Sequence, residues 1–375
     1  MKRTNLISII VICLTTSLIV AQDKTTDYLN MKWKHVATRM PAQWYGSEEA
    51  KLVADNILLS QKKIGGWEKN KTFHKPFSKE ERDYYIKNKS EIGGTFDNGA
   101  TITELQFLAK MYSQNKNKRY KEAFENGLNY IFISQYKNGG WPQFFPVKKA
   151  KKEIALDKTE PYSMHITYND NAMVNIMKFL KDIMLDSKEY VTFQLNQNIK
   201  TKVKMAFNKG IACFLKTQIV IDNKPTVWCA QHNKETLLPA KARSYELPSF
   251  SGSESVGIVI MLMDIEKPSK DIIDAVNGAV EWFENHKIEG IKVIREIQED
   301  GRKNRIVVKD KNAPKLWGRF NDLETGEIFF CSRDGIKKDA LSKISYERRN
   351  GYSWYTNAPK KVLDRYPEWK KINHN

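Results

Sequence analysis

Cysteine is scarce in this chain of 375 residues, and its scarcity argues against two classes of protein. Three of the four cysteines lie beyond the amino-terminal apolar run, namely Cys213, Cys229 and Cys331. An odd number does not form a disulfide framework, although one pair could still bridge. No cysteine or histidine pattern has the spacing of a zinc site. We therefore expect neither a disulfide-rich scaffold nor a zinc protein.

Long apolar runs are also lacking, with one exception at the amino terminus. Two basic residues precede the nearly uncharged run 6–20, and the small residue Ala21 follows it. A short run of this kind, with no second apolar segment after it, is typical of a signal peptide rather than of a membrane anchor. We predict a signal peptide at residues 1–21 and a single catalytic domain at residues 22–375. The protein would be secreted or periplasmic, without a stable membrane anchor.

Acidic residues are outnumbered by basic residues. The chain has 44 Asp and Glu against 62 Lys and Arg, which gives a formal net charge of +18. Removal of Lys2 and Arg3 with the signal peptide leaves +16, since 18 − 2 = 16. An exported basic protein meets acidic polysaccharide more often than nucleic acid, so we expect a polysaccharide partner and no nucleic acid. A basic surface that only keeps the protein soluble would give the same charge. A protein of this size can work alone, and we expect a monomer.

Helical periodicity is the dominant pattern of apolar residues in the sequence. Apolar residues recur at the i, i+3, i+4 and i+7 spacing of an amphipathic helix in several segments. These segments are 50–58, 102–112, 124–131, 173–180, 203–214 and 273–283. The stretch from Val256 to Met263 is apolar all round and predicts a buried helix. The sequence therefore predicts a mainly α protein.

A weak internal repeat accompanies these helices. A glutamine after a predicted helix is followed by a tryptophan, twice within a GGW triplet. The pairs are Gln61 and Trp67, Gln135 and Trp141, and, at looser spacing, Gln218 and Trp228. Two triplets could match by coincidence, but their position after a helix favours a true repeat. Repeated helix pairs of this size indicate an α/α toroid, in which pairs stack around a common core.

The repeat makes a geometric prediction. The loops that open the first helix of each pair lie at the same end of such a stack. These loops are Asp97-Asn98, Asn169-Asp170 and 251–254, and we expect them to lie close together. The long connections 219–250 and 290–357 are expected to wall a cleft. Short strands are possible at 291–297, 305–308 and 328–331.

Asp97 and Asp170 each stand beside an asparagine just before a predicted helix. One interpretation is that both residues cap these helices, because Asp and Asn accept hydrogen bonds from free backbone N–H groups there. The other is a cation site, because hard cations such as Ca²⁺ bind carboxylate and amide oxygens. Asp97, Asn98 and Asp170 on neighbouring loops would leave coordination positions open for substrate oxygens.

Three arginines are embedded among aromatic and turn residues. They are Arg243 in ARSYELP, Arg319 in WGRF and Arg333 in CSRDG. A loop arginine is usually exposed or paired with a neighbour such as Glu246. Guanidinium groups also match carboxylates bidentately, and a chain of uronic acids offers one carboxylate per sugar.

Taken together, the motifs resemble pectate lyases of polysaccharide lyase family ten. The resemblance spans roughly Trp44 to Pro359. It is carried by GGW, FDNGATITELQFLAK, QYKNGGWPQFFP, ITYNDNAM, PTVWCAQH, ARSYELPSFSGSES, LWGRFNDLETGEIFFCSRDG and RRNGYSWYTNAP. Any one of these motifs alone is weak, and their order along the chain makes chance similarity improbable.

The resemblance implies an (α/α)₃ toroid with long loops and a few short strands lining a cleft at one end. It implies anti β-elimination of α-1,4-linked polygalacturonate, giving 4,5-unsaturated oligogalacturonides. In the family pattern, Asp97, Asn98 and Asp170 match the residues that hold catalytic Ca²⁺. Arg243 matches the proposed base. Arg319 and Arg333 match arginines that bind galacturonate carboxylates, and Arg349 and Tyr352 in the last motif match less closely.

Arginine as a base is demanding, because its free pKa lies above about 12. A nearby cation and other arginines would disfavour its charged form, so activity should rise into the alkaline range. Two other functions stay open on the residues alone. One is an unsaturated-uronyl hydrolase or another glycosidase on a helical barrel, with Asp97 and Asp170 as acid and base. The other is a protein that binds acidic polysaccharide without cleaving it.

Overall fold

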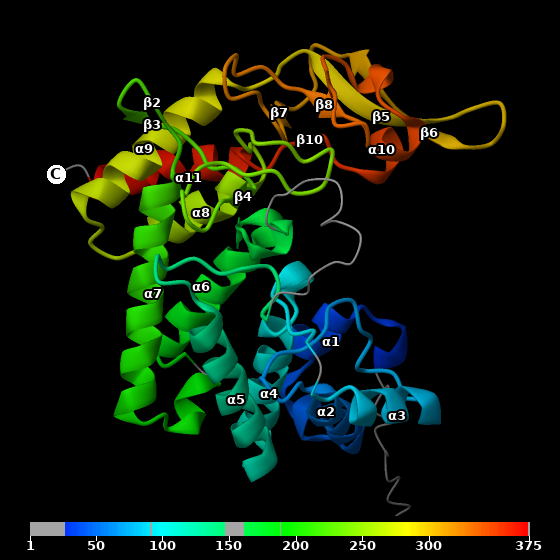
Figure 1. The fold of residues 1–375 in the computed structure, drawn as a ribbon, viewed down its shortest axis with the longest axis vertical. Coiled ribbons are helices and arrows are strands. Elements are labelled where there is room, and N and C mark those ends of the chain that lie inside the picture. Colours follow the sequence, from blue (N-terminus) through cyan, green and yellow to red (C-terminus); the bar gives the residue numbers. More distant parts are fainter. Residues whose placement is uncertain (1–26, 91, 147–160, 188, 374–375) are drawn as a thin grey trace, which may run out of the picture.

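The computed structural model describes residues 27–90, 92–146, 161–187 and 189–373 (Figure 1). The predicted signal peptide lies outside the described residues. Within them the α-helices are α1 Trp33–Arg39, α2 Glu48–Ser60, α3 Lys79–Lys87, α4 Ile102–Gln114, α5 Lys118–Ser134, α6 Ala172–Met184, α7 Gln197–Thr217, α8 Glu254–Met263, α9 Lys270–Asn285, α10 Tyr346–Gly351 and α11 Lys360–Asn373. None of these helices is long and apolar enough to cross a membrane.

The helices stack as pairs. The pairs are α4 with α5, α6 with α7, and α8 with α9. The first helices α4, α6 and α8 contact one another in succession, and the second helices α5, α7 and α9 do the same. Helix α2 flanks α4 and α5 at one end of the stack, and α11 packs on α8 and α9 at the other (Figure 1). The predicted α/α toroid of helix pairs is confirmed.

The internal repeat is confirmed by its hydrogen bonds. Each repeat glutamine follows the last residue of a helix, and its side-chain Nε2 donates to two backbone carbonyls at 2.7–3.0 Å. One carbonyl lies in the following loop and the other in the second helix of the next pair. The acceptors are Gly65 and Ala123 for Gln61, Gly139 and Ala206 for Gln135, and Thr226 and Ala275 for Gln218. The third copy, which is looser in sequence, makes the same contacts.

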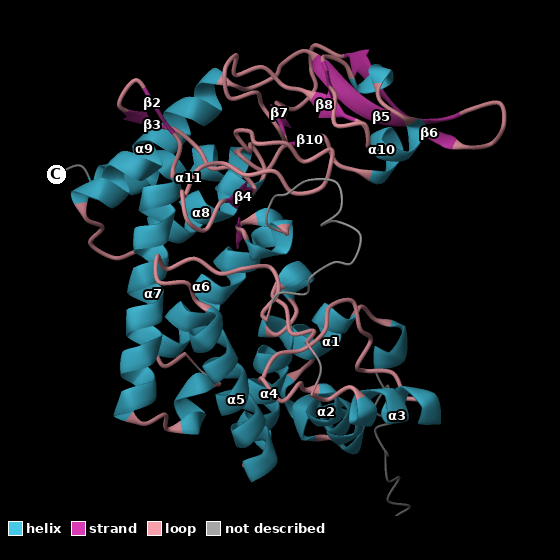
Figure 2. Ribbon diagram, viewed as in Figure 1, coloured by secondary structure: helices cyan, strands magenta, loops and turns pink. Residues whose placement is uncertain are grey.

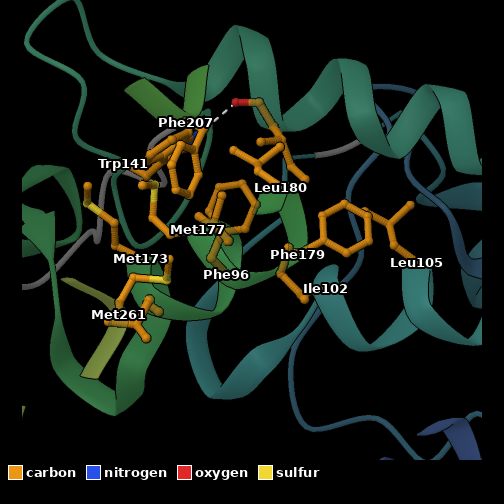
Figure 3. Close-up of a cluster of buried hydrophobic side chains, with 14 of the residues drawn as sticks. Phe96, Ile102, Leu105, Trp141, Met173, Met177, Phe179, Leu180, Phe207 and Met261 are labelled. Carbon is orange, nitrogen blue, oxygen red and sulfur yellow. Dashed lines mark hydrogen bonds between the residues drawn. The ribbon is translucent and has the colours of Figure 1, made fainter. Parts of the chain in front are cut away.

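The repeat tryptophans complete this arrangement. Each buried indole Nε1 donates to a carbonyl of the helix that precedes it, at 2.7–2.9 Å. Trp141 packs beside Gly210 of α7, where an added Cβ would lie 2.2 Å from the sulfur of Met177. Figure 3 shows Trp141 and Met177 among the buried side chains of the central pair. Close approach of the helices therefore depends on glycine at this position.

All described strands except the first, β1, belong to the long connections 219–250 and 290–357 (Figure 2). The strands are β1 Ile166–Thr167, β2 Val220–Ile221, β3 Lys224–Pro225, β4 Gln231–His232, β5 Ile291–Ile297, β6 Lys303–Lys309, β7 Trp317–Gly318, β8 Phe330–Cys331, β9 Lys337–Lys338 and β10 Tyr355–Thr356. All pair antiparallel in two-stranded sheets. The possible strands at 291–297, 305–308 and 328–331 correspond to β5, β6 and β8.

The carboxy-terminal connections build a second, smaller core. It contains Tyr245, Phe320, Phe330 and Trp354, with Tyr352 packed against it. Cys213, Cys229 and Cys331 are buried and free, so the pair that could have bridged is not formed among them. The aromatic residue Tyr245 of this second core lies close to the guanidinium groups of Arg243, Arg333 and Arg348.

Replacement of Gln61 by leucine tests the repeat. The change removes two buried hydrogen bonds, one to the loop carbonyl of Gly65 and one to the carbonyl of Ala123 in α5. We expect a loss of about 2–4 kcal/mol in the free energy of unfolding, measured by urea denaturation. Gln197→Leu, at an exposed position, is the matched control and should change stability by less than about 0.5 kcal/mol. Equal stability of the two variants would contradict a structural role for the repeat glutamines.

Candidate active site

Two short 3₁₀ turns carry the residues predicted to bind a cation. We call them the Asp97 turn (Asp97–Gly99) and the Asp170 turn (Asn169–Asn171). Asn98 and Asp170 have positive φ angles of 54° and 51°, which Asn and Asp tolerate better than most residues. Neither α4 nor α6 receives a side-chain cap hydrogen bond at its N-cap residue. The capping interpretation of Asp97 and Asp170 is therefore wrong.

The Asp97 turn is fixed to the first GGW motif through Thr101. This buried β-branched residue has φ 65°, a conformation that needs support from its surroundings. Its hydroxyl donates to the Thr95 carbonyl at 2.9 Å and accepts from the Trp67 backbone N–H at 3.1 Å. The repeat tryptophan thereby sets the position of the turn.

The Asp170 turn is fixed by the PTVWCAQH segment. The backbone N–H groups of Tyr168 and Asn169 both donate to the Ala230 carbonyl, at 2.9 and 3.0 Å. Buried His232 holds that segment, because its Nε2 accepts from the Cys229 N–H at 3.1 Å and its Nδ1 lies 2.9 Å from the Leu237 carbonyl. Burial lowers the pKa of His232 to about 4, so the ring is neutral and structural.

The helix-pair openings meet at one end, as predicted. The Asp97 turn contacts the Asp170 turn, which contacts α8 at the third opening. Asp97 is buried and forms a close ion pair with Lys69, and Asn98 donates to the side chain of Asn70 at 2.9 Å. The Lys69 ammonium group therefore occupies the position in which the Asp97 carboxylate would bind another cation.

Arg319 connects the Asp170 turn to α8. Its Nη2 donates to Glu254 Oε1 at 2.5 Å and to Asn169 Oδ1 at 3.0 Å, and it lies 3.9 Å from Asp170 Oδ1. Burial opposes the charge on Arg319, but Glu254, Tyr352 and Asp170 outweigh it, so the pKa of Arg319 is raised. Burial also raises the pKa of Glu254, against the opposing effect of Arg319.

Arg243 also lies near Tyr352. The centre of the Tyr352 ring is 4.5 Å from the Arg319 guanidinium carbon and 5.8 Å from that of Arg243. Arg243 forms a bidentate pair with Glu246, whose hydrogen bond is the main cause of a raised Arg243 pKa. Burial lowers the Arg243 pKa, but Glu246 outweighs it, so the lowering expected from neighbouring charges is not found among the described residues.

Arg333 and Arg349 are placed differently. Arg333 is largely exposed, lies 5.7 Å from the Tyr245 ring centre and pairs with Glu347 at 3.0 Å. The Arg349 guanidinium is held by Asn304 Oδ1 at 2.9 Å and by the carbonyls of Ser342 and Ile344, so the structure does not bring it together with the other three arginines. The neighbouring Arg348 lies 4.4 Å from the Tyr245 ring instead.

Several residues at this site escaped sequence reasoning. The sequence indicates Glu246 only as a salt-bridge partner and Glu254 only as part of a helix opening. Apart from its position after a GGW motif, nothing in the sequence indicates that Lys69 belongs to the site. Tyr245 and Tyr352 lie in the arginine motifs, but only the fold shows that their rings lie close to the guanidinium groups.

The donor set suits a hard cation. Asp97, Asn98 and Asp170 offer carboxylate and amide oxygens on two contacting turns. No group of three or more His, Cys, Asp or Glu able to hold a metal occurs among the described residues. A cation at these turns would therefore need further oxygen atoms from outside the protein, such as those of a substrate carboxylate.

Comparison with known proteins decides the family. The family model described as pectic acid lyase matches residues 61–363. This chain belongs to the pectic acid lyase family. The lyase is similar to a solved family 10 polysaccharide lyase from Cellvibrio cellulosa, with 34% identity and a TM-score of 0.71 over 88% of this chain and 96% of that one.

A mutant of the Cellvibrio cellulosa enzyme in complex with trigalacturonic acid is similar to the same extent. It has 33% identity and a TM-score of 0.71, over 88% of this chain and 97% of that one. No curated protein matches the chain. The resemblance noted from the motifs is confirmed, and the protein is a polysaccharide lyase.

Proposed function

We propose that this lyase cleaves α-1,4-linked polygalacturonate by anti β-elimination and releases 4,5-unsaturated oligogalacturonides. The observation that carries the proposal is the convergence of two oxygen-rich turns with Arg319 and Arg243, whose guanidinium groups both lie near the Tyr352 ring. The similar Cellvibrio cellulosa lyase was solved with trigalacturonic acid, which supports the substrate class.

Arg319 and Arg333 are proposed to bind galacturonate carboxylates. Arg319 is anchored by Glu254 through Nη2. Arg333 is exposed beside Tyr245 and can reach a polymer that passes over the surface. Substrate binding through Arg349 would require its present hydrogen bonds to Asn304 and two carbonyls to break.

Asp97, Asn98 and Asp170 are proposed to hold Ca²⁺. When bound there, the cation would neutralise negative charge that develops on the substrate carboxylate. Lys69 supports this assignment, since its ammonium group already pairs with Asp97 in the structure. Lys69 must leave Asp97 before another cation can take its place.

Arg243 is proposed as the base. In the elimination, the C5 proton passes to a neutral guanidine, the C5–H electron pair forms the C4–C5 double bond, and the C4–O bond breaks with its electrons on the leaving oxygen. That oxygen then takes up a proton. Glu246 makes the neutral form of Arg243 scarce, because it raises the pKa of Arg243. A higher pKa also makes each neutral guanidine a stronger base, which offsets part of this scarcity.

The carboxylates of this site do not favour a glycosidase. A general acid needs a carboxyl group that stays protonated, and burial away from cations is the usual cause. Asp97 lies against Lys69, Glu246 against Arg243, and Glu254 against Arg319. The pKa of Glu246 is lowered by its hydrogen bonds to Arg243 and Tyr352 despite burial, whereas burial raises the pKa of Glu254, whose Oε1 is already bonded to Arg319. An elimination that uses arginine explains this pairing with cations better.

We further propose that the protein is exported. The support is the basic start and apolar run before Ala21, together with a polymeric substrate that cells meet outside the cytoplasm. The mature chain from residue 22 would act as one catalytic domain and as a monomer.

Lyase activity is the direct test of the proposed function. We expect polygalacturonate incubated with the protein to gain the ultraviolet absorbance of an unsaturated uronate, and a chelator to abolish the gain until Ca²⁺ is restored. A hydrolase would produce new chain ends without this absorbance. A protein that binds the polymer with no product, with or without chelator, would contradict a lyase.

Arg243→Lys tests the base. Below the pKa of Arg243 the neutral fraction grows about tenfold per pH unit, so wild-type kcat should rise through the alkaline range. Lysine cannot reproduce the bidentate pair with Glu246, and we expect kcat to fall by about 100-fold at alkaline pH. Near-wild-type turnover of the variant, measured by product absorbance, would show that another group takes the proton.

Lys69→Met tests the cation position. Loss of the competing ammonium beside Asp97 should tighten Ca²⁺ binding by roughly tenfold, equivalent to about 1.4 kcal/mol, measured by calorimetry without substrate. Lys63→Met, at an exposed position on the same loop, is the control and should bind like wild type. Unchanged affinity in Lys69→Met would place the cation elsewhere.

A further inference from the structure

Glu246 holds Arg243 in a single orientation. Its Oε2 accepts from Arg243 Nε at 2.7 Å and from the Arg243 backbone N–H at 3.1 Å, and its Oε1 accepts from Arg243 Nη2 at 2.5 Å. The Tyr352 hydroxyl donates to the same Oε1 at 2.7 Å. The two oxygens thus accept two hydrogen bonds each.

This bonding leaves Glu246 no role of its own in proton transfer. An ionised carboxylate has about four acceptor sites, and four donors already fill them. The Glu246 side chain is only 4% exposed, whereas that of Arg243 is 44% exposed. Hydrogen bonds from Arg243 and Tyr352 keep the pKa of Glu246 below its ordinary value despite its burial. The carboxylate is therefore a fixed, charged anchor beneath an accessible guanidinium.

The anchor determines which part of Arg243 is available. Nε and Nη2 face Glu246, so Nη1 is the one guanidinium nitrogen without a hydrogen bond among the described residues. The rings of Tyr245 and Tyr352 lie 4.9 and 5.8 Å from the guanidinium carbon and restrict it further. Without these contacts an arginine side chain would sample many rotamers, and this freedom corresponds to about 2 kcal/mol of conformational entropy.

We propose that Glu246 is the positioning residue for Arg243, and that the Tyr352 hydroxyl fixes Glu246 so that Nη1 is presented to the substrate. This inference rests on the proposed function, because it assigns Glu246 a task only if Arg243 takes part in the reaction. The ring of Tyr352 also faces Arg319, which is anchored by Glu254 in a similar way. One tyrosine therefore sets the spacing between the base and an arginine that binds a substrate carboxylate.

The effect of Glu246 is expected on kcat rather than on substrate binding. Misplacement of a reacting group by about 1 Å can reduce a rate about 100-fold. Glu246→Gln keeps the size of the side chain but places an amide N–H₂ opposite one arginine donor, so the bidentate pair is lost. We expect kcat to fall about 100-fold on polygalacturonate at saturating Ca²⁺, with KM within roughly threefold of wild type.

A double-mutant cycle separates positioning from other roles. Because Glu246 acts through Arg243, Glu246→Gln should lower the residual kcat of Arg243→Lys by less than about threefold. Glu284→Gln, which removes the charge of a surface glutamate paired with Lys287, is the control and should leave kcat unchanged. Ca²⁺ affinity, measured by calorimetry, should be the same in wild type and Glu246→Gln.

Three results would overturn the inference in an active wild-type lyase. They are wild-type kcat in Glu246→Gln, an equal loss in the wild-type and Arg243→Lys backgrounds, or a Glu246→Gln loss confined to KM. If thermal melting shows that Glu246→Gln does not fold, Tyr352→Phe decides, since it removes only the hydroxyl bond to Glu246. That variant should lose about tenfold in kcat, and full activity would contradict the proposal. An inactive wild-type protein would instead contradict the proposed function itself.

Discussion

The fold depends on a repeated pair of polar contacts inside an apolar helix stack. In each of three units a glutamine amide donates to a loop carbonyl and to a carbonyl in the second helix of the next pair, and a tryptophan indole donates to a carbonyl of the preceding helix. Breaking these buried hydrogen bonds would be costly, so they permit little sliding between neighbouring pairs. Because the pairs are in register, their openings lie at one end. The same contacts that hold the stack together thus bring the Asp97 and Asp170 turns against each other.

Above this stack, the site is organised by anchored charges. Arg243 and Arg319 each pair with a nearly buried glutamate, and both guanidinium groups lie near the Tyr352 ring. Burial of an unpaired arginine or glutamate would be unfavourable, and pairing the two charges offsets the cost of burying them. The consequence is a rigid cationic surface beside an oxygen-rich pair of turns. Such a surface can bind an acidic sugar without a large rearrangement of the side chains.

Much of this arrangement could be predicted from the chain alone. Apolar spacing located the helices of the three pairs, and the all-apolar run from Val256 to Met263 correctly indicated the buried helix α8. The identical spacing of Gln61 and Gln135 from their tryptophans revealed the repeat, although the third copy makes the same contacts at a longer spacing. The capping interpretation of Asp97 and Asp170 failed because both residues lie in turns with left-handed backbone that precede the helix starts. The grouping of Arg349 with the other arginines was not found in the structure, since Asn304 on a distant hairpin holds its guanidinium.

The sequence by itself determined the helix pairs, their repeat, the resemblance to a lyase family and the arginine-bearing loops, because each is written in local spacing or in ordered motifs. Only the tertiary structure decided which charges meet. Lys69 reaches Asp97 across 28 positions, Arg319 reaches Glu254 across 65, and Tyr352 reaches Glu246 across 106. Contacts between such distant positions have no local signature, since they depend on how the helix pairs stack and on where the long connections return over them.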